Sequence, residues 1–124
     1  MKPYTELEPL RDVVLEASWI RSVIASPGRL LVMLEAVIAK DSPRLEQPRP
    51  GEQHFWLPGV LQFDGVTELR WTGQPVSPNQ DADGSTDYGN LDQLSFDGDH
   101  FHLESEAGVI DVVASGITLD LGER

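Results

Sequence analysis

The chain has 124 residues, no cysteine, and apolar residues at 40% of its composition. We expect residues 1–124 to form one β domain, because this length supports a single buried core. The absence of cysteine excludes disulfides, zinc ribbons and thiol nucleophiles, and suits a reducing compartment. The first residues lack the apolar segment of a signal peptide, and no stretch is apolar enough to span a membrane. The sequence therefore predicts a cytoplasmic protein that has no membrane partner.

The formal net charge is −12, and it is distributed unevenly. Residues 1–62 carry 8 acidic and 7 basic side chains, whereas residues 63–124 carry 13 acidic side chains and only Arg70 and Arg124 as bases. Nucleic acid is an unsuitable partner, because phosphate binding requires clustered basic residues. The acidic half is either a solvated surface, a docking face for a basic partner, or a cation site.

Segments 12–15 and 19–25 are rich in β-branched and aromatic residues, which favours two strands before a turn at Ser26-Pro27-Gly28. The apolar run at 29–39 is ambiguous, since Ser26 and Pro27 could begin a short helix there. A long central strand is the preferred interpretation, because the run has no polar face at helical spacing and a sandwich could cover both of its faces. Glu35 then requires a bend or an edge position.

The middle of the chain contains two more apolar segments, Val60 to Phe63 and Val66 to Trp71, on either side of Asp64-Gly65. A two-residue turn there would send Leu69 and Trp71 to the face opposite Leu61, so either a bulge or burial on both faces is required. Residues 40–53 and 72–90 are rich in proline and glycine and are expected to be loops. The three tryptophans are expected in the core.

The last third predicts two hairpins, with turns at Asp97-Gly98 and Ser115-Gly116. The alternation places four apolar residues of the first hairpin on one face and its two histidines on the other. In the second hairpin, Asp111 would lie opposite Asp120. The four strands would form a meander. The complete expectation is an all-β antiparallel sandwich or flattened barrel of seven to eight strands.

The 72–90 loop contains the first candidate for a metal site. Asn79, Asp81, Asp83, Gly84, Ser85, Asp87 and Asn90 occupy positions 1, 3, 5, 6, 7, 9 and 12 of a twelve-residue calcium-loop pattern. Position 12 is an asparagine where a bidentate carboxylate is needed, and Pro78 precedes the loop instead of a helix. The alternatives are a calcium site formed by Asp81, Asp83 and Asp87 and an ordinary exposed loop.

A second candidate lies on the predicted strand around residue 102. His100, His102 and Glu104 alternate on one strand face, and two imidazoles at this spacing can chelate a transition metal. The spacing of His100, His102 and Glu106 resembles the first metal motif of cupins, but the glycine before the pair and a later histidine are missing. Polar residues on the solvated side of a hairpin explain the same pattern.

No set of residues completes a catalytic site, so an enzyme is the less favoured interpretation. The Asp111–Asp120 pair would need solvent screening, a bridging cation or a raised carboxyl pKa. There is no nucleophile elbow and no phosphate-binding glycine loop.

Four runs distributed along the chain resemble a group of small bacterial β-rich proteins of unknown function. They are Glu16-Ala17-Ser18-Trp19, Ser26-Pro27-Gly28-Arg29-Leu30, Pro50-Gly51-Glu52-Gln53 and Asp87-Tyr88-Gly89-Asn90-Leu91. The resemblance implies a bacterial β domain and no particular chemistry. We therefore expect a non-enzymatic interaction module that docks a protein partner, or a second copy as a homodimer, through an acidic face or the 72–90 loop. The alternative is a divalent-cation-binding protein or metal-dependent hydrolase that uses calcium or a transition metal.

Overall fold

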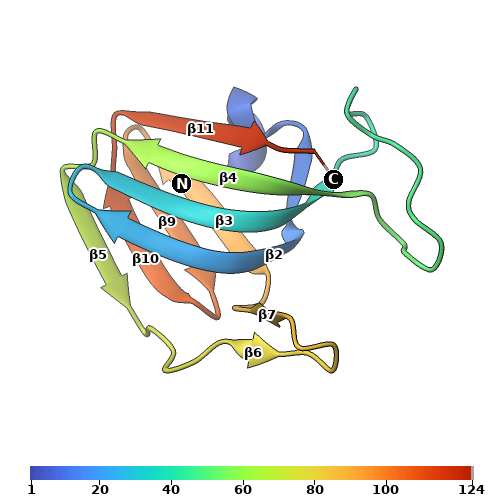
Figure 1. Cartoon of the computed structure of the whole chain (residues 1–124). Helices are drawn as coiled ribbons and strands as arrows, with labels where there is room; N and C mark the ends of the chain where they lie inside the picture. The colour runs from blue at the N-terminus through green and yellow to red at the C-terminus, as the bar shows by residue number, and fades with distance from the viewer. Residues whose placement is uncertain (124) are drawn as a thin grey trace.

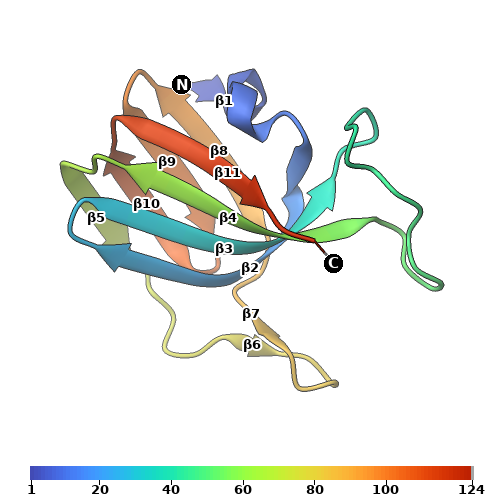
Figure 2. The same ribbon diagram turned by 45° about the horizontal axis from the view of Figure 1, so that its top comes forward.

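The computed structural model describes residues 1–123 and shows two antiparallel sheets packed face to face (Figure 1). Sheet A has five strands in the order β1-β8-β9-β10-β5, and sheet B has four in the order β11-β4-β3-β2. Strands β6 and β7 form a separate hairpin that lies beside the edge strand β2 of sheet B (Figure 2). The predicted all-β antiparallel class is confirmed, and the sheets do not close into a barrel.

Eleven strands and two short 3-10 helices are present within residues 1–123. Sheet A consists of β1 (Lys2–Pro3), β5 (Glu68–Thr72), β8 (Leu91–Asp97), β9 (His100–Ser105) and β10 (Gly108–Val113). Sheet B consists of β2 (Val13–Ser26), β3 (Arg29–Ile38), β4 (Trp56–Asp64) and β11 (Gly116–Leu121). The small hairpin is β6 (Asn79–Gln80) and β7 (Thr86–Asp87), and the helices are η1 (Tyr4–Glu6) and η2 (Glu8–Leu10). The count exceeds the predicted seven to eight strands because β1, β6 and β7 have two residues each. No helix in the described part of the chain has the length and apolarity needed to cross a membrane.

The ambiguous run at 29–39 is a strand, so the alternative of a short helix is wrong. Strand β3 lies at the interior of sheet B between β4 and β2. Its side chains alternate, with Leu30, Val32 and Leu34 in the core and Leu31, Met33 and Glu35 on the outer face. The expectation that both faces are covered is therefore wrong. Glu35 is accommodated because the outer face is open.

The two short segments predicted at 12–15 and 19–25 belong to one strand, β2, which is interrupted by register shifts around residues 14–22. Ser18 is fully buried at this irregularity. Its hydroxyl donates to the carbonyl of Val14 at 2.7 Å and accepts from the amide of Val37 at 2.9 Å. The side chain thus satisfies backbone groups that the bulge removes from the regular ladder.

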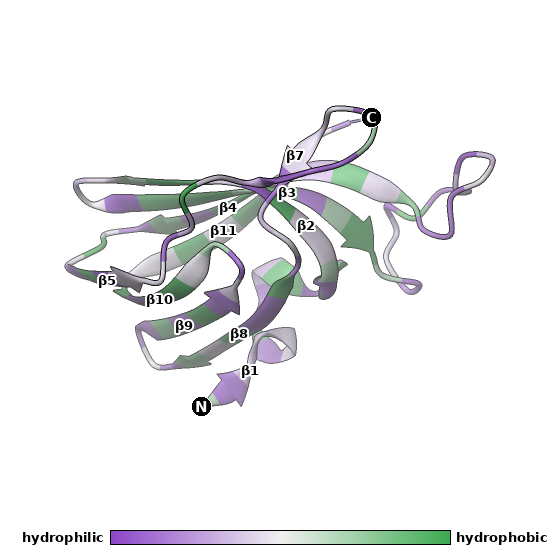
Figure 3. Ribbon diagram, turned by 90° about the horizontal axis from the view of Figure 1, so that it is seen from below, coloured by the Kyte–Doolittle hydropathy of each residue, from purple (hydrophilic) through white to green (hydrophobic). Residues whose placement is uncertain are grey.

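The core lies between the two sheets, and its centre is a contact between Phe63 of β4 and Phe101 of β9. The ring centroids are 5.1 Å apart in an edge-to-face arrangement, which is favourable for aromatic rings. Hydrophobic and hydrophilic positions alternate along β9 from His100 to Glu104, as Figure 3 shows. Trp56 and Trp71 are half-buried, but Trp19 is 37% exposed. The prediction that all three tryptophans lie in the core is wrong for Trp19.

The predicted turns at Asp64-Gly65 and Ser115-Gly116 are instead crossings between the sheets. Strand β4 belongs to sheet B and β5 to sheet A, while β10 belongs to sheet A and β11 to sheet B. The crossings contact each other, because the amide of Ser115 donates to the carbonyl of Asp64 at 3.0 Å. Gly65 has a φ of +62°, and a Cβ there would lie 2.0 Å from the Ser115 hydroxyl oxygen. Glycine is therefore required at this position.

The prediction of a four-stranded meander is therefore wrong for its last strand, because β8, β9 and β10 lie in sheet A and β11 lies in sheet B. Gly116 does not adopt the positive φ of a tight two-residue hairpin, and β11 pairs with β4. In the β8–β9 hairpin the two turn residues are Gly98 and Asp99 instead of the predicted Asp97 and Gly98. The β8 residues next to the turn therefore pair with β9 residues two positions further along the chain than predicted, as in Phe96 with Phe101. A shift of two residues leaves every side chain on its predicted face. Gly98 has a φ of +57° at the first loop position, where a type II′ turn requires glycine.

The Phe63–Phe101 contact predicts the effect of truncating a core ring. We expect Phe63→Ala to lower the free energy of unfolding by about 3–5 kcal/mol, because it leaves a cavity between the sheets. Ile24→Ala, on the outer face of sheet B, should cost about 1 kcal/mol or less. Urea unfolding measures both values. Equal losses for the two variants would contradict the placement of the core.

Candidate functional site

The outer face of sheet A carries the predicted histidine pair. His100, His102 and Glu104 of β9 alternate with the buried residues Phe101 and Leu103. Asp111 of the neighbouring strand β10 lies directly opposite His102. The backbone register therefore brings two imidazoles and two carboxylates together on one surface.

These four side chains form a chain of hydrogen bonds through Asp111. Its Oδ1 atom lies 2.8 Å from Nε2 of His100 and 2.8 Å from Nδ1 of His102. On its other side, the His102 ring places Nε2 3.1 Å from Oε2 of Glu104. Each imidazole therefore has a carboxylate partner on a solvent-accessible face.

The arrangement favours the protonated form of His102. A neutral imidazole carries one N–H, so it can donate to only one of the two carboxylates that face its ring nitrogens. The hydrogen bond to Asp111 raises the pKa of His102 above 6.5, burial opposes this rise to a lesser extent, and the hydrogen bond to Glu104 raises the pKa further. Correspondingly, the hydrogen bond from His102 lowers the pKa of Asp111 below 3.8, with His100 contributing less. At mildly acidic pH the site holds an imidazolium between two carboxylates.

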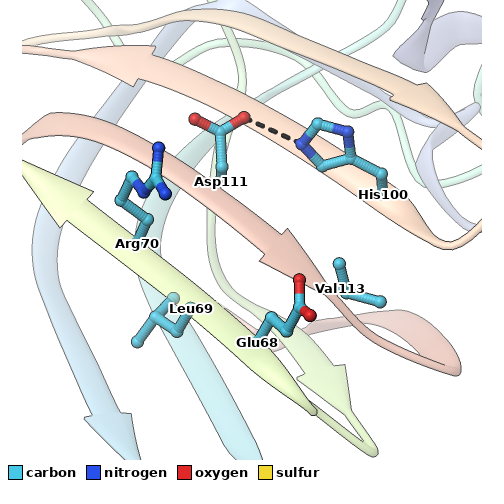
Figure 4. Close-up of a pocket in the computed structure, with 6 residues that line it drawn as sticks. All are labelled: Glu68, Leu69, Arg70, His100, Asp111 and Val113. Atoms are coloured by element: carbon cyan, nitrogen blue, oxygen red, sulfur yellow. Dashed lines mark hydrogen bonds and ion pairs between the residues drawn. The ribbon is translucent and has the colours of Figure 1, made fainter.

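An open depression of about 830 Å³ lies beside this chain of hydrogen bonds, toward strand β5 (Figure 4). Glu68, Leu69 and Arg70 line it from β5, with His100, Asp111 and Val113 on the opposite side. Within residues 1–123, the side chains of Glu68 and Arg70 form no hydrogen bond or ion pair. The floor is a sheet surface, so the depression is shallow and does not enclose a small molecule.

Among the described residues, no serine or threonine hydroxyl forms a hydrogen bond with His100 or His102. Ser95 pairs with His102 across the β8–β9 ladder and is buried. Its hydroxyl donates to the sulfur of Met1 at 3.4 Å and accepts from the side-chain Nε2 of Gln93 at 3.3 Å. Both ring nitrogens of His102 contact carboxylates, Asp111 and Glu104, and neither contacts the Ser95 hydroxyl. His102 is therefore not placed to act as a base for Ser95.

The calcium-like loop places its acidic residues in two separate environments. The Ser85 hydroxyl contacts Asp81 at 3.2 Å and Asp83 at 2.6 Å, and this hydrogen bond lowers the pKa of Asp83. Asp87 is buried, and it accepts a hydrogen bond from the amide of Gly89 at 2.7 Å. Asp81 and Asp83 are thus joined through Ser85, whereas Asp87 caps the backbone that leads into β8.

Across residues 1–123, no group of three or more histidine, aspartate or glutamate side chains is arranged to hold a metal ion. The residues predicted to bind a metal, Asp81, Asp83 and Asp87 in the loop and His100 and His102 on β9, instead form hydrogen bonds with protein groups. The predicted Asp111–Asp120 pair is wrong, because Asp111 faces His102 and Arg70, while Asp120 faces Val60 across β4.

The structure also exposes an apolar surface that the sequence patterns did not indicate. We define the sheet B face as the outward side chains Trp19, Ile24, Leu31, Met33, Pro58 and Val60. Polar side chains interrupt it, because Glu35 lies between Trp19 and Pro58, Ser22 lies opposite Met33, and Gln62 lies opposite Leu31. Arg21 and Asp120 lie at its margins. Ile24 is 49% exposed, and an open depression of about 320 Å³ lies over Met33 and Val60. The apolar run of β3 fits a strand covered on both faces equally well, so the sequence alone does not reveal this open surface.

Comparison with protein-family models, with curated proteins and with solved structures finds no match. The resemblance to small bacterial proteins stays an expectation, and the function is argued from the two outer faces.

The histidine–carboxylate chain predicts a pH-dependent contribution to stability. Because the native pKa of His102 is raised, its contribution is complete below pH 6.5 and is lost as the pH rises through the native pKa. Because the native pKa of Asp111 is lowered, its contribution is present above pH 3.8 and is lost as the pH falls through the native value. His102→Gln should therefore cost about 1 kcal/mol or less near pH 5, and less still near pH 9.

Urea unfolding at the two pH values measures this difference, and Asp111→Asn supplies the control background. In that background we expect the pH-dependent part of the His102→Gln effect to shrink, because the main partner is gone. A cost of His102→Gln that is the same at both pH values would contradict the assignment.

Proposed function

We propose that this domain is a non-enzymatic interaction module that docks a protein partner on the sheet B face. The observation that carries the proposal is the uncovered row of apolar side chains with Ile24 and Trp19 exposed. Apolar side chains that cluster on an exposed sheet surface and are rimmed by polar residues often mark a contact with another protein. Aromatic and methionine side chains, here Trp19 and Met33, are also enriched at the centres of interfaces.

The charges of the chain favour a partner whose apolar patch is bordered by basic residues. Glu35 and Asp120 flank the depression on the sheet B face, with Arg21 as the opposing charge. The net charge of −12 attracts a basic partner over longer distances and accelerates its encounter. The negative charge of the chain thus mainly raises the association rate, while burial of the apolar side chains of the sheet B face supplies most of the affinity. The lack of cysteine suits a cytosolic setting for this role.

The β6–β7 hairpin is a less suitable contact surface than the sheet B face. Its exposed residues between 79 and 85 are small and polar. Arg21 donates a hydrogen bond to the carbonyl of Thr86 at 2.9 Å, which ties the hairpin to β2. This contact places the hairpin beside the sheet B face, where it can border a bound partner.

The sheet B face predicts that Ile24→Asn weakens partner binding about tenfold or more, since replacing an apolar contact residue by a polar one should cost over about 1 kcal/mol of binding free energy. Val76→Asn is the matched control, because Val76 is fully exposed outside this face. Affinity capture from the source organism identifies the partner, and titration of the purified pair gives the dissociation constants. Equal affinities for wild type, Ile24→Asn and Val76→Asn would rule out the sheet B face.

A divalent-cation protein is the second candidate, favoured by the convergence of His100 and His102 on one oxygen of Asp111. Imidazole and carboxylate are ligands that zinc and related ions accept. In this candidate Asp81, Asp83 and Asp87 would serve calcium. Both sets would have to give up their present hydrogen bonds first.

We therefore expect the melting temperature to stay unchanged when excess calcium, zinc or manganese is added. A ligand at 100 times its dissociation constant would add about 2.7 kcal/mol of stability, which a melting curve detects readily. A rise with zinc that His102→Gln abolishes would instead establish the cation-binding function. A rise with calcium that Asp83→Asn abolishes would establish the loop site.

A further inference from the structure

Strand β5 forms the margin of sheet A and has a strand neighbour on one side only, β10 (Figures 1 and 2). The opposite margin differs, because β1 covers part of β8. A strand margin with unpaired backbone groups is a template for pairing with another strand, unless it is blocked. Strand β5 contains no proline that would block it.

The hydrogen-bond pattern shows which backbone groups of β5 face outward. The carbonyl of Val113 accepts from the amide of Thr67 at 2.9 Å, so alternate residues of β10, including Asp111, direct their backbone groups toward β5. Their partners in β5 are Glu68 and Arg70. Since backbone direction alternates along a strand, the amides and carbonyls of Leu69 and Trp71 face the open margin.

The side chains of β5 are equally suited to pairing. Leu69 lies opposite the core residue Val112 and so belongs to the inner face of sheet A, yet it is 39% exposed. Glu68 and Arg70 are on the outer face and have no side-chain ion pair among the described residues (Figure 4). One strand thus carries two unpaired opposite charges on either side of an exposed leucine.

We infer that a second copy of this chain pairs with it through β5, antiparallel and with the two-fold axis at Leu69. In this register Leu69 lies opposite Leu69 of the other copy, and their amides and carbonyls can exchange hydrogen bonds. Each Glu68 then lies opposite Arg70 of the other copy, and opposite charges at this spacing stabilise a strand pair. A register centred on Arg70 would place two guanidiniums together. Charge complementarity therefore selects Leu69 as the centre.

The pairing extends sheet A across two copies and covers the exposed leucines with each other. It goes beyond the proposed function, because it uses the margin of sheet A and leaves the sheet B face open. The contact is only five residues long on each side, and two copies of charge −12 repel each other. The dimer is therefore expected to be weak, and its measurement requires high protein concentration.

Sedimentation velocity of the full chain between about 10 μM and 1 mM tests the inference. Wild type should approach a dimer at the upper concentration. Glu68→Arg and Arg70→Glu should each stay monomeric, because each places like charges opposite one another. An equimolar mixture of the two variants should dimerise again, since every cross-strand pair in the mixed dimer has opposite charges. Glu46→Arg and Arg49→Glu, on the exposed 40–53 loop, are charge-matched controls that should dimerise as wild type does.

A wild type that remains monomeric near 1 mM, or a dimer that neither β5 variant disrupts, would overturn the inference. Amide exchange gives a readout without substitutions, since exchange of the Leu69 amide should slow as concentration rises. An unchanged exchange rate would also overturn it. The proposed function fails separately, because a monomer that still loses its partner with Ile24→Asn disproves only the β5 pairing.

Discussion

The contact between the apolar inner faces of sheets A and B determines where the remaining side chains lie. Phe63 and Phe101 meet between the sheets, and alternation along the regular parts of the strands then sends every second residue outward. The histidine–carboxylate chain on sheet A and the apolar row on sheet B are consequences of this alternation. Both proposed contacts depend on it, because a shift of one residue in any of these strands would exchange its buried and exposed faces.

Local patterns were sufficient to predict the all-β class, the strand at 29–39 and the outward face of His100 and His102. These features follow from alternation within one strand or across one tight turn. The routing of strands between sheets could not be predicted in the same way. Asp64-Gly65 and Ser115-Gly116 have the composition of hairpin turns, but Gly65 is needed for its close approach to Ser115, which comes from a distant part of the sequence. Only the assembled structure contains that contact.

The candidate sites likewise combine features that depend on one strand with features that depend on the pairing of distant strands. Alternation on β9 predicts that the two histidines and Glu104 lie together. The partner Asp111 depends on the β9–β10 register, whereas the hairpin pattern of the last two strands predicts Asp120 as its partner. The sheet B face was missed because an apolar run at 29–39 fits both a doubly covered strand and a strand with one open face. Burial in the structure distinguishes these cases, and it places Met33 on an open outer face beside the exposed Ile24. The open margin of β5 likewise depends on the crossing that separates it from β4.

The most direct test of this account is a nuclear Overhauser spectrum of the protein in solution. The two-sheet arrangement predicts cross-peaks between the rings of Phe63 and Phe101, and between the backbone protons of Leu119 and Leu61 on β11 and β4. Cross-peaks between Leu119 and Val112 would show that the last two strands form a hairpin within one sheet. That result would contradict the packing from which both proposed interaction surfaces are derived.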